Sequence, residues 1–193
     1  MKCVVLFVFV FMRKSEANFT KDEDCNVIRI EEWSGSSLRR FLPLPKPIQG
    51  AVIQHTYVYE CNSDEECVDA LKKIRNMHTE IMGFDDIGNS FYIGGNGKVY
   101  EGAGWNRVGA HTRFYNGRSI GISFIGDFTK KLPTKTALQA AKDLLKCGEK
   151  FGHLSSNFSL YGHLQLSSTE SPGEALYEEI QTWPHWSEDV SKL

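Results

Sequence analysis

The chain of 193 residues lacks several features that would place it directly in a class of proteins. Its longest apolar run covers only the nine residues from Val4 to Met12, well short of the ~20 that a membrane-spanning helix needs. It contains no Cys-x-x-Cys pair, so a zinc site built on thiolates is disfavoured. It has neither an internal repeat nor a low-complexity tract. The length therefore suits a single domain with its own core.

The N-terminal segment has the pattern of a secretory signal. The apolar run is followed by the small residues Ser15 and Ala17, which predicts cleavage after Ala17 and a signal peptide over residues 1–17. Arg13 and Lys14, directly after the run, are unusual for such a signal, and a type II membrane anchor is the alternative. Secretion is the favoured prediction.

Secretion would set the charge and the candidate modifications of the mature chain. Cleavage after Ala17 would leave 19 basic and 23 acidic residues, a net charge of −4. With this balance, neither nucleic acid nor an anionic membrane surface is an expected partner. The Asn-x-Ser/Thr triplets at Asn18 and Asn157 are candidate glycosylation sites, although such triplets often occur by chance.

Removal of the signal would also leave an even number of cysteines. Cys25, Cys61, Cys67 and Cys147 remain after the loss of Cys3. An even set in a secreted chain predicts two disulfides, and four cysteines allow three pairings. Cys61 and Cys67 are close enough in sequence to close a small ring.

The hydrophobic patterns predict an α/β layer fold, in which helices cover one mixed sheet. A Pro-rich connector at 42–47 precedes the first buried strand, so residues 18–49 are predicted as an arm and connector, and residues 50–187 as the domain. Strands are expected at 51–58, at 90–102 as a hairpin around a Gly-Asn-Gly turn, at 119–128 and at 158–166. Helices are expected at 63–82, 134–152 and 173–183.

Three of the six histidines fall where such sheets bind ligands, at strand ends and the loops that follow: His55, His111 and His163. For any single histidine, a hydrogen-bonded structural role is the more common one. His55 and His163 are more suggestive, because both are expected on strands next to loops. A zinc hydrolase needs three protein ligands and an open fourth position, and two histidines alone would bind zinc weakly.

Six motifs occur in order along the chain: AVIQHT, FDDIGNSFYIGGNGKVYEGAGW, GAHT, YNGRSIGISFIGDF, YGHLQLSSTESPG and IQTWPHW. They resemble the peptidoglycan recognition proteins, relatives of the zinc-dependent N-acetylmuramoyl-L-alanine amidases, over roughly residues 26–187. The resemblance implies a single-domain, amidase-like α/β fold with a central mixed sheet, about three helices and a ligand groove on one side. Together with the spacing, it also implies that Cys25 pairs with Cys147 and Cys61 with Cys67.

The resemblance further implies that the zinc site of the amidases is lost. Catalytic members hold zinc with the first His of His-His-Thr, a His in Gly-His and the Cys of Thr-x-Cys-Pro-Gly, and a Tyr assists. Here those positions hold Gln54, His163, Ser171 and Asn89. His55 is not expected to substitute, because adjacent strand residues point to opposite faces, and a serine hydroxyl is a poor zinc ligand. The prediction is a chain with no metal, no cofactor and no amidase activity.

The groove itself is expected to survive. In binding members it holds the stem peptide of peptidoglycan, and by resemblance the contacts here are His55, Thr56, His78, His111 and Asn116. These residues supply hydrogen-bonding groups suited to peptide amides and carboxylates. Aromatic walls are expected from Phe84 and Trp105, although core packing explains Trp105 equally well. Asn89, His163 and Ser171 complete the candidate ligand-binding set at the former zinc position.

The two common stem peptides differ at their third residue, which is L-lysine or meso-diaminopimelate with one extra carboxylate. Members that prefer the latter typically have Gly-Trp before Asp-Ile-Gly and an Arg that can clamp the added carboxylate. This chain has Gly83 and Phe84 at the first pair and Ala103 at the Arg position. The missing guanidinium favours Lys-type peptidoglycan, whereas Gly83 is the residue of the other class.

The resulting prediction is a secreted pattern-recognition receptor of innate immunity that binds bacterial muropeptides without cleaving them. Family likeness implies partners among other recognition proteins and a serine-protease cascade that leads to Toll signalling in antibacterial defence. One alternative is an accessory role in delivering diaminopimelate-type fragments to a membrane receptor. Another is residual peptidase action without zinc, using Ser171 with His163.

Overall fold

The computed structural model describes residues 25–36 and 42–193. The predicted signal peptide and the triplet at Asn18 lie outside these residues. Within them, no helix is long and apolar enough to cross a membrane. The second triplet is described, and Asn157 is exposed to solvent.

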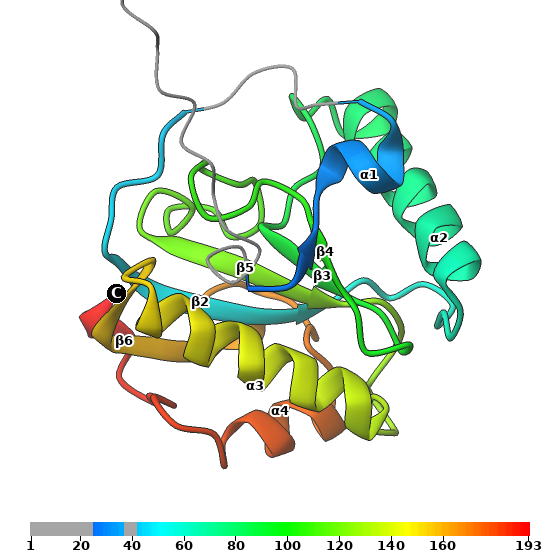
Figure 1. The fold of residues 1–193 in the computed structure, drawn as a ribbon. Helices are drawn as coiled ribbons and strands as arrows, with labels where there is room; N and C mark the ends of the chain where they lie inside the picture. Colours follow the sequence, from blue (N-terminus) through cyan, green and yellow to red (C-terminus); the bar gives the residue numbers. More distant parts are fainter. Residues whose placement is uncertain (1–24, 37–41) are drawn as a thin grey trace, which may run out of the picture.

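A six-stranded mixed sheet forms the centre of the molecule, with strand order β1-β4-β3-β5-β2-β6 (Figure 1). The strands are β1 (Val27–Ile28), β2 (Ile48–His55), β3 (Phe91–Ile93), β4 (Val99–Glu101), β5 (Ser119–Phe124) and β6 (Leu154–Gly162). The strand β2 runs parallel to both of its neighbours, β5 and β6, and β3 is parallel to β5. Only the β3–β4 hairpin is antiparallel among the described strand pairs. The predicted mixed sheet and the predicted hairpin are confirmed.

Helices cover both faces of this sheet. The helices are α1 (Ile30–Ser34), α2 (Asp64–Asn76) with the π-helical turn η1 (Met77–Ile81), α3 (Lys135–Lys150) and α4 (Glu174–Ile180). The helices α3 and α4 lie on one side of the sheet, and α1 and α2 lie on the other (Figure 1). The three predicted helices are confirmed as α2, α3 and α4, and α1 is an addition to them. Two short 3-10 turns, η2 (His163–Gln165) and η3 (Val190–Lys192), follow β6 and lie near the C-terminal end.

Alternation along the strands decides which side chains face which layer. Ile53 of β2 and Ile122 of β5 belong to the core beneath α3 and α4. Their neighbours Gln54 and Ser123 therefore face the opposite side of the sheet, where both border a pocket. Because α1 and α2 cover only the β3–β4 part of that side, the β2–β5 part is left available for a ligand.

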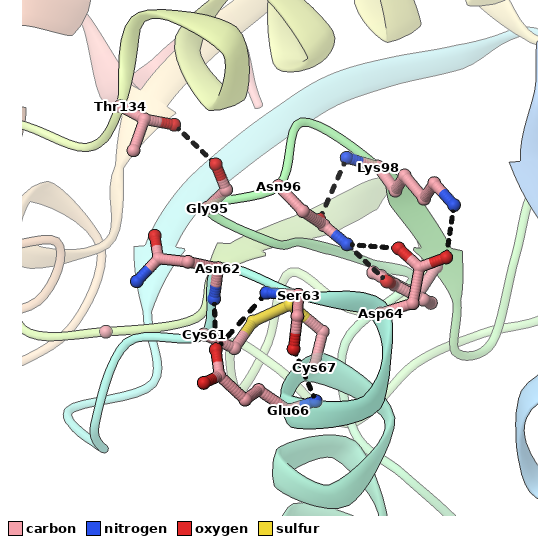
Figure 2. The surroundings of a disulfide bond; sticks show 12 residues. Cys61, Asn62, Ser63, Asp64, Glu66, Cys67, Gly95, Asn96, Lys98 and Thr134 are labelled. Carbon is pink, nitrogen blue, oxygen red and sulfur yellow. Dashed lines mark hydrogen bonds and ion pairs between the residues drawn. A yellow bond between two sulfur atoms is a disulfide. The ribbon is translucent and has the colours of Figure 1, made fainter.

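Both disulfides form with the pairing that spacing and family likeness implied. Cys25 is bonded to Cys147 of α3, and Cys61 to Cys67 in the first turns of α2. The small ring encloses the start of α2, where Ser63 Oγ accepts the N–H of Glu66 at 3.2 Å (Figure 2). The Glu66 carboxylate in turn accepts the N–H of Ser63, which completes a capping box.

The described part of the predicted arm belongs to the folded layers. The strand β1 pairs with β4 at the edge of the sheet, and Ile30 and Trp33 of α1 are buried. The indole Nε1 of Trp33 donates to the backbone oxygen of Glu101 at 2.8 Å. The strand β2 begins at Ile48, so the predicted domain start at residue 50 falls inside it.

Candidate ligand-binding site

A pocket of about 610 Å³ lies on the side of the sheet opposite α3 and α4. Its floor comes from the end of β2 and from β5, and its walls come from η1, the loop before β3, the Ala110–His111 segment and the loop after β6. Eight of the predicted site residues line this pocket: His55, Thr56, His78, Phe84, Asn89, His111, His163 and Ser171. Segments that are far apart in the sequence thus come together around this one pocket.

Gln54 and Asn89, which the resemblance predicts at the positions of a zinc ligand and the assisting Tyr, are hydrogen-bonded to each other. The Asn89 Nδ2 donates to Gln54 Oε1 at 2.6 Å. The Gln54 Nε2 donates to the backbone oxygen of His111 at 3.0 Å and to Thr112 Oγ1 at 3.1 Å. Both amides are almost fully buried, at 6% and 7% exposure. Across the pocket floor, the two side chains therefore join β2 to the loop before β3, which contains Asn89, and to the segment that contains His111 and Thr112.

Ser171, which is predicted at the third ligand position, also makes a hydrogen bond with the backbone. Its Oγ accepts the N–H of His55 at 3.1 Å. The His55 imidazole lies at the end of β2, where its Nδ1 accepts the N–H of Phe128 at 3.2 Å. Burial lowers the pKa of His55 and outweighs the opposing effect of Asp127 and Glu170, which keeps the ring neutral at neutral pH.

Two further pocket histidines, His111 and His163, are also neutral near pH 7. Burial lowers the pKa of His111 to about 4, and the ring lies within reach of Thr112 Oγ1 at 3.0 Å and of the Ser119 backbone oxygen at 3.3 Å. Burial, assisted by neighbouring His55, lowers the pKa of His163 to about 4. Neutral imidazoles can both donate and accept hydrogen bonds, so this floor suits amide and hydroxyl groups of a ligand. His163 begins the turn η2 and does not lie on a strand, which corrects the sequence prediction.

The three residues that the resemblance predicts at the amidase zinc position do not fit zinc. Of the three, only His163 offers an imidazole, while Gln54 and Ser171 already make hydrogen bonds with the framework. A catalytic zinc needs three protein donors of the imidazole, thiolate or carboxylate kind. Among the described residues, no three such side chains gather closely enough to hold a metal ion.

One wall of the pocket is built from η1 and the turn that follows it. His78 of η1 accepts the N–H of Gly88 at its Nδ1, 3.0 Å away, and its ring lies 5.4 Å from that of Phe84. Gly83 between them has φ of +71°, a conformation that glycine adopts without strain. The backbone alone therefore explains Gly83, and its presence carries no information about the ligand class.

Besides Gly83, three predicted site residues lie outside the pocket lining. Trp105 is a core residue at 5% exposure, stacked on His153 at 4.7 Å, which corrects its prediction as a pocket wall. Ala103 is buried behind the floor, where its N–H donates to the Asn89 backbone oxygen at 3.0 Å. Asn116 Oδ1 accepts the N–H groups of His111 and Thr112 at 2.9 and 2.8 Å, so it shapes the loop and does not border the pocket.

Other lining residues were not predicted as site residues. Ser123 could have been found, because it pairs with Gln54 on the neighbouring strand and shares its face. Tyr57 is 68% exposed at the pocket rim and adopts a positive φ of 56°, for which the sequence gives no signal. The remaining unpredicted lining residues are Ile74, Met77, Met82, Tyr92, Ala110, Thr169 and Glu170.

Comparison with known proteins identifies relatives of the whole folded chain. The family model described as N-acetylmuramoyl-L-alanine amidase matches residues 44–174. A peptidoglycan recognition protein of Trichoplusia ni is 46% identical over 183 residues, covering 95% of this chain and 96% of its own. The structure of Manduca sexta peptidoglycan recognition protein 1 superimposes with a TM-score of 0.84 at 45% identity, covering 87% and 96% of the two chains.

A further solved relative contains a ligand. Peptidoglycan recognition protein LE was solved in complex with tracheal cytotoxin, a monomeric diaminopimelic acid-type peptidoglycan. It matches with a TM-score of 0.83 and 41% identity, covering 87% of this chain and 99% of that one. The predicted fold is thereby confirmed at the level of whole structures.

Proposed function

The chain belongs to the peptidoglycan recognition proteins of the N-acetylmuramoyl-L-alanine amidase family, and from this premise we propose that it binds the stem peptide of bacterial peptidoglycan without cleaving it. One observation carries the proposal. His55, Thr56, His78 and His111 border one open pocket whose floor is held by the Gln54–Asn89 amide pair. The pocket therefore offers a ready set of hydrogen-bonding groups for a peptide, with no metal-binding set among them.

The absence of amidase chemistry follows from the donors present. Hydrolysis by this family needs a zinc-bound water, and His163 is the single imidazole left at that position. The peptidase alternative needs a base that holds the Ser171 hydroxyl. The Ser171 Oγ accepts a backbone N–H from His55, and among the described contacts no base accepts the Ser171 hydroxyl and no carboxylate orients His163. We therefore assign the pocket to binding.

Lys-type stem peptides are the proposed preference. The extra carboxylate of diaminopimelate needs a cationic partner, and Ala103 offers only a methyl group behind the pocket floor. An unpartnered carboxylate in the groove costs about tenfold in affinity. The solved complex of the LE relative contains a diaminopimelate-type ligand, so delivery of such fragments is the second candidate function.

The biological setting of the proposal is extracellular. Two disulfides are stable in an oxidising compartment, which accords with secretion by the predicted signal segment. In such a setting, a binding protein of this kind would act as a pattern-recognition receptor of antibacterial immunity. We propose that it engages other recognition proteins and a Toll-type serine-protease cascade when it carries peptidoglycan.

Titration calorimetry with matched muropeptides tests the proposal. Lys-type and diaminopimelate-type muramyl pentapeptides are titrated into the purified protein with and without EDTA, and the recovered ligands are analysed for cleavage. We expect intact ligands, about tenfold tighter binding of the Lys-type peptide and no effect of EDTA. Release of stem peptide by the zinc-loaded protein would refute the binding-only assignment. A preference for the diaminopimelate peptide would favour the second candidate.

A further inference from the structure

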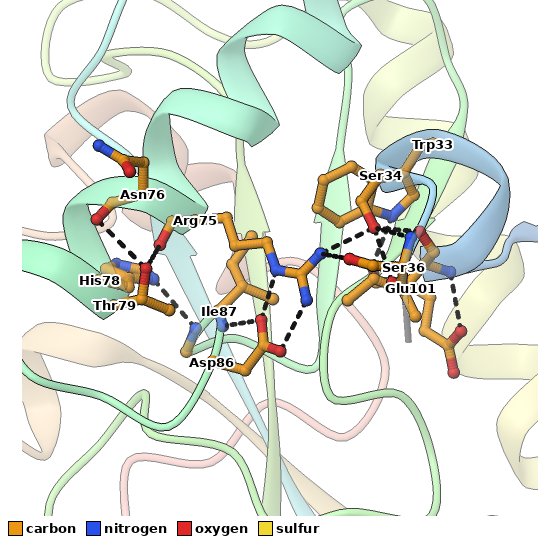
Figure 3. A network of polar contacts seen from close by, with 12 residues as sticks. Trp33, Ser34, Ser36, Arg75, Asn76, His78, Thr79, Asp86, Ile87 and Glu101 are labelled. Carbon is orange, nitrogen blue, oxygen red and sulfur yellow. Dashed lines mark hydrogen bonds and ion pairs between the residues drawn. The ribbon is translucent and has the colours of Figure 1, made fainter. Parts of the chain in front are cut away.

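Arg75 lies in the last turn of α2, outside the pocket lining, and its guanidinium is held on two sides (Figure 3). The Nε and Nη2 atoms donate to the two carboxylate oxygens of Asp86 at 2.6 and 2.8 Å. The side chain of Arg75 is only 15% exposed to solvent, and that of Asp86 only 6%. A bidentate pair with this little solvent has a fixed geometry, because the planar fork matches the carboxylate at both oxygens.

The same pair begins a chain of contacts that ends in the pocket. Asp86 Oδ1 also accepts the N–H of Ile87 at 2.7 Å, which fixes the backbone that leads into the loop before β3. The next N–H, that of Gly88, donates to His78 Nδ1 at 3.0 Å, and the following residue is Asn89 of the pocket floor. The Arg75–Asp86 pair thus closes the base of the segment 76–85, which carries one wall of the pocket.

The opposite side of the guanidinium contacts the N-terminal part of the structure. The Nη1 atom donates to Ser34 Oγ at 2.7 Å and to Ser36 Oγ at 3.0 Å. These hydroxyls lie in and after α1, on the opposite side of the guanidinium from His78 (Figure 3), and neither serine lines the pocket. They therefore provide a way to weaken the anchorage of Arg75 without touching Asp86.

We infer that Arg75 is a positioning residue for ligand binding, acting through Asp86 on the His78 wall and the Asn89 floor. The inference rests on the proposed function, because the bound state is the peptidoglycan complex. Arg75 itself is not among the residues that line the pocket. Its role is to place the Gly88 N–H and the His78 ring where a ligand meets them. Because this wall is then ordered before the ligand arrives, binding does not lose affinity to the cost of ordering it.

The experiment compares Arg75→Met and Asp86→Asn with the double variant Ser34→Ala/Ser36→Ala, the matched control on the other side of the same guanidinium. Asp86→Asn keeps the size of the side chain, and it covers the case in which Arg75→Met does not fold. Each variant is checked for cooperative thermal unfolding, and binding is measured well below the transition. Two signals are read in the ligand-free protein by NMR: the exchange rate of the Gly88 amide and the pH titration of the His78 ring.

We expect Arg75→Met and Asp86→Asn to weaken Lys-type muropeptide binding about tenfold in a folded protein. In both variants the Gly88 amide should exchange about tenfold faster, and the His78 midpoint should rise towards the ordinary imidazole value of about 6.5. The control should keep the wild-type affinity within about twofold, with both NMR signals unchanged. A purely stabilising role would instead lower the melting temperature and leave these signals in place.

Unchanged affinity in a folded Asp86→Asn variant would overturn the inference, and so would an equal loss in the serine control. If the wild-type protein binds no muropeptide, the proposed function fails. The Gly88 and His78 signals then still decide whether Arg75 orders the wall, because both are measured without a ligand.

Discussion

The side-chain amide of Asn89 donates to Gln54 Oε1 at 2.6 Å on the floor of the pocket. The motif resemblance predicts that these two positions correspond to a zinc ligand of the amidases and the Tyr that assists it. Here the pair joins β2 directly to the loop before β3, and Gln54 Nε2 extends the link to His111 and Thr112. A buried amide network can hold these segments in place without a metal, since each of these polar groups has a partner.

Gln54→Ala tests whether the amide network supports the pocket floor. The substitution removes the three hydrogen bonds of Gln54 and leaves Asn89 Nδ2 and the His111 oxygen buried without that partner. We expect the free energy of unfolding to fall by about 2 kcal/mol, and the melting temperature by about 4–8 °C. Gln49→Ala is the matched control, because Gln49 lies on the same strand, is exposed and contacts only the backbone of Pro47. Equal stability of the two variants would contradict the prediction.

Neutral histidines in the pocket predict that stability falls in weak acid. His111 and His163 each have a pKa of about 4 in the folded protein, against about 6.5 for an unfolded chain. Between these values the unfolded chain binds more protons, so the free energy of unfolding falls as pH drops from about 6.5 to about 4, and the contribution is fully present above about 6.5. Urea denaturation at about pH 7.5 and about pH 5 measures the difference.

A variant separates this effect from general acid sensitivity. His163→Gln keeps a polar side chain but removes one titrating group, so the loss of stability between the two pH values should become smaller. If the wild-type protein were equally stable at both values, the neutral-imidazole assignment would be wrong. If His163→Gln kept the full pH dependence, His163 would not contribute to it.

The sequence predicted those parts of the site that have short, local or motif-borne signals. The helix α2 follows from Ser63 as N-cap and from the apolar spacing that ends in Leu71 and Ile74. The hairpin of β3 and β4 follows from alternation around a Gly-rich turn. The loss of zinc ligands at Gln54 and Ser171 stays a prediction, which rests on the recognisable motifs that contain both residues.

Other features required the three-dimensional structure. The helix α1 has five residues, too few to show a helical period, and it was not predicted. His163 directly follows the apolar strand pattern, but the chain turns at Gly162 and the histidine starts η2. Trp105 lies in a Gly-rich stretch without any period, so its burial and its packing between Phe91 and His153 were needed to assign it to the core. The Gln54–Asn89 bond joins residues 35 positions apart, which no local pattern reveals.

Loss of the long-range disulfide should destabilise the folded protein strongly. The Cys25–Cys147 bond joins residues 122 positions apart and ties the segment before β1 to α3. A cross-link over a loop of this length restricts the unfolded chain, so Cys25→Ser/Cys147→Ser should lower the free energy of unfolding by about 3–5 kcal/mol. Urea denaturation of the double variant measures the loss. Cys61→Ser/Cys67→Ser is the comparison. Because this disulfide closes a much smaller ring, its removal should lower the free energy of unfolding by less. A larger decrease in this variant would contradict the loop-length argument.

The two aromatic residues predicted as pocket walls should respond differently to truncation. Phe84 borders the pocket and is partly exposed, so Phe84→Ala should weaken muropeptide binding about fivefold and change the free energy of unfolding by less than about 1 kcal/mol. Trp105 is packed between Phe91 and His153, so Trp105→Phe should lower the free energy of unfolding by about 1–3 kcal/mol and leave affinity within about twofold. Calorimetric titration and urea denaturation of both variants measure the two quantities. The reverse pattern, in which Trp105→Phe weakens binding and Phe84→Ala lowers stability, would restore Trp105 to the binding site. A residue that only fills the core contributes equally to the empty and the peptide-bound protein, so its truncation would not change affinity.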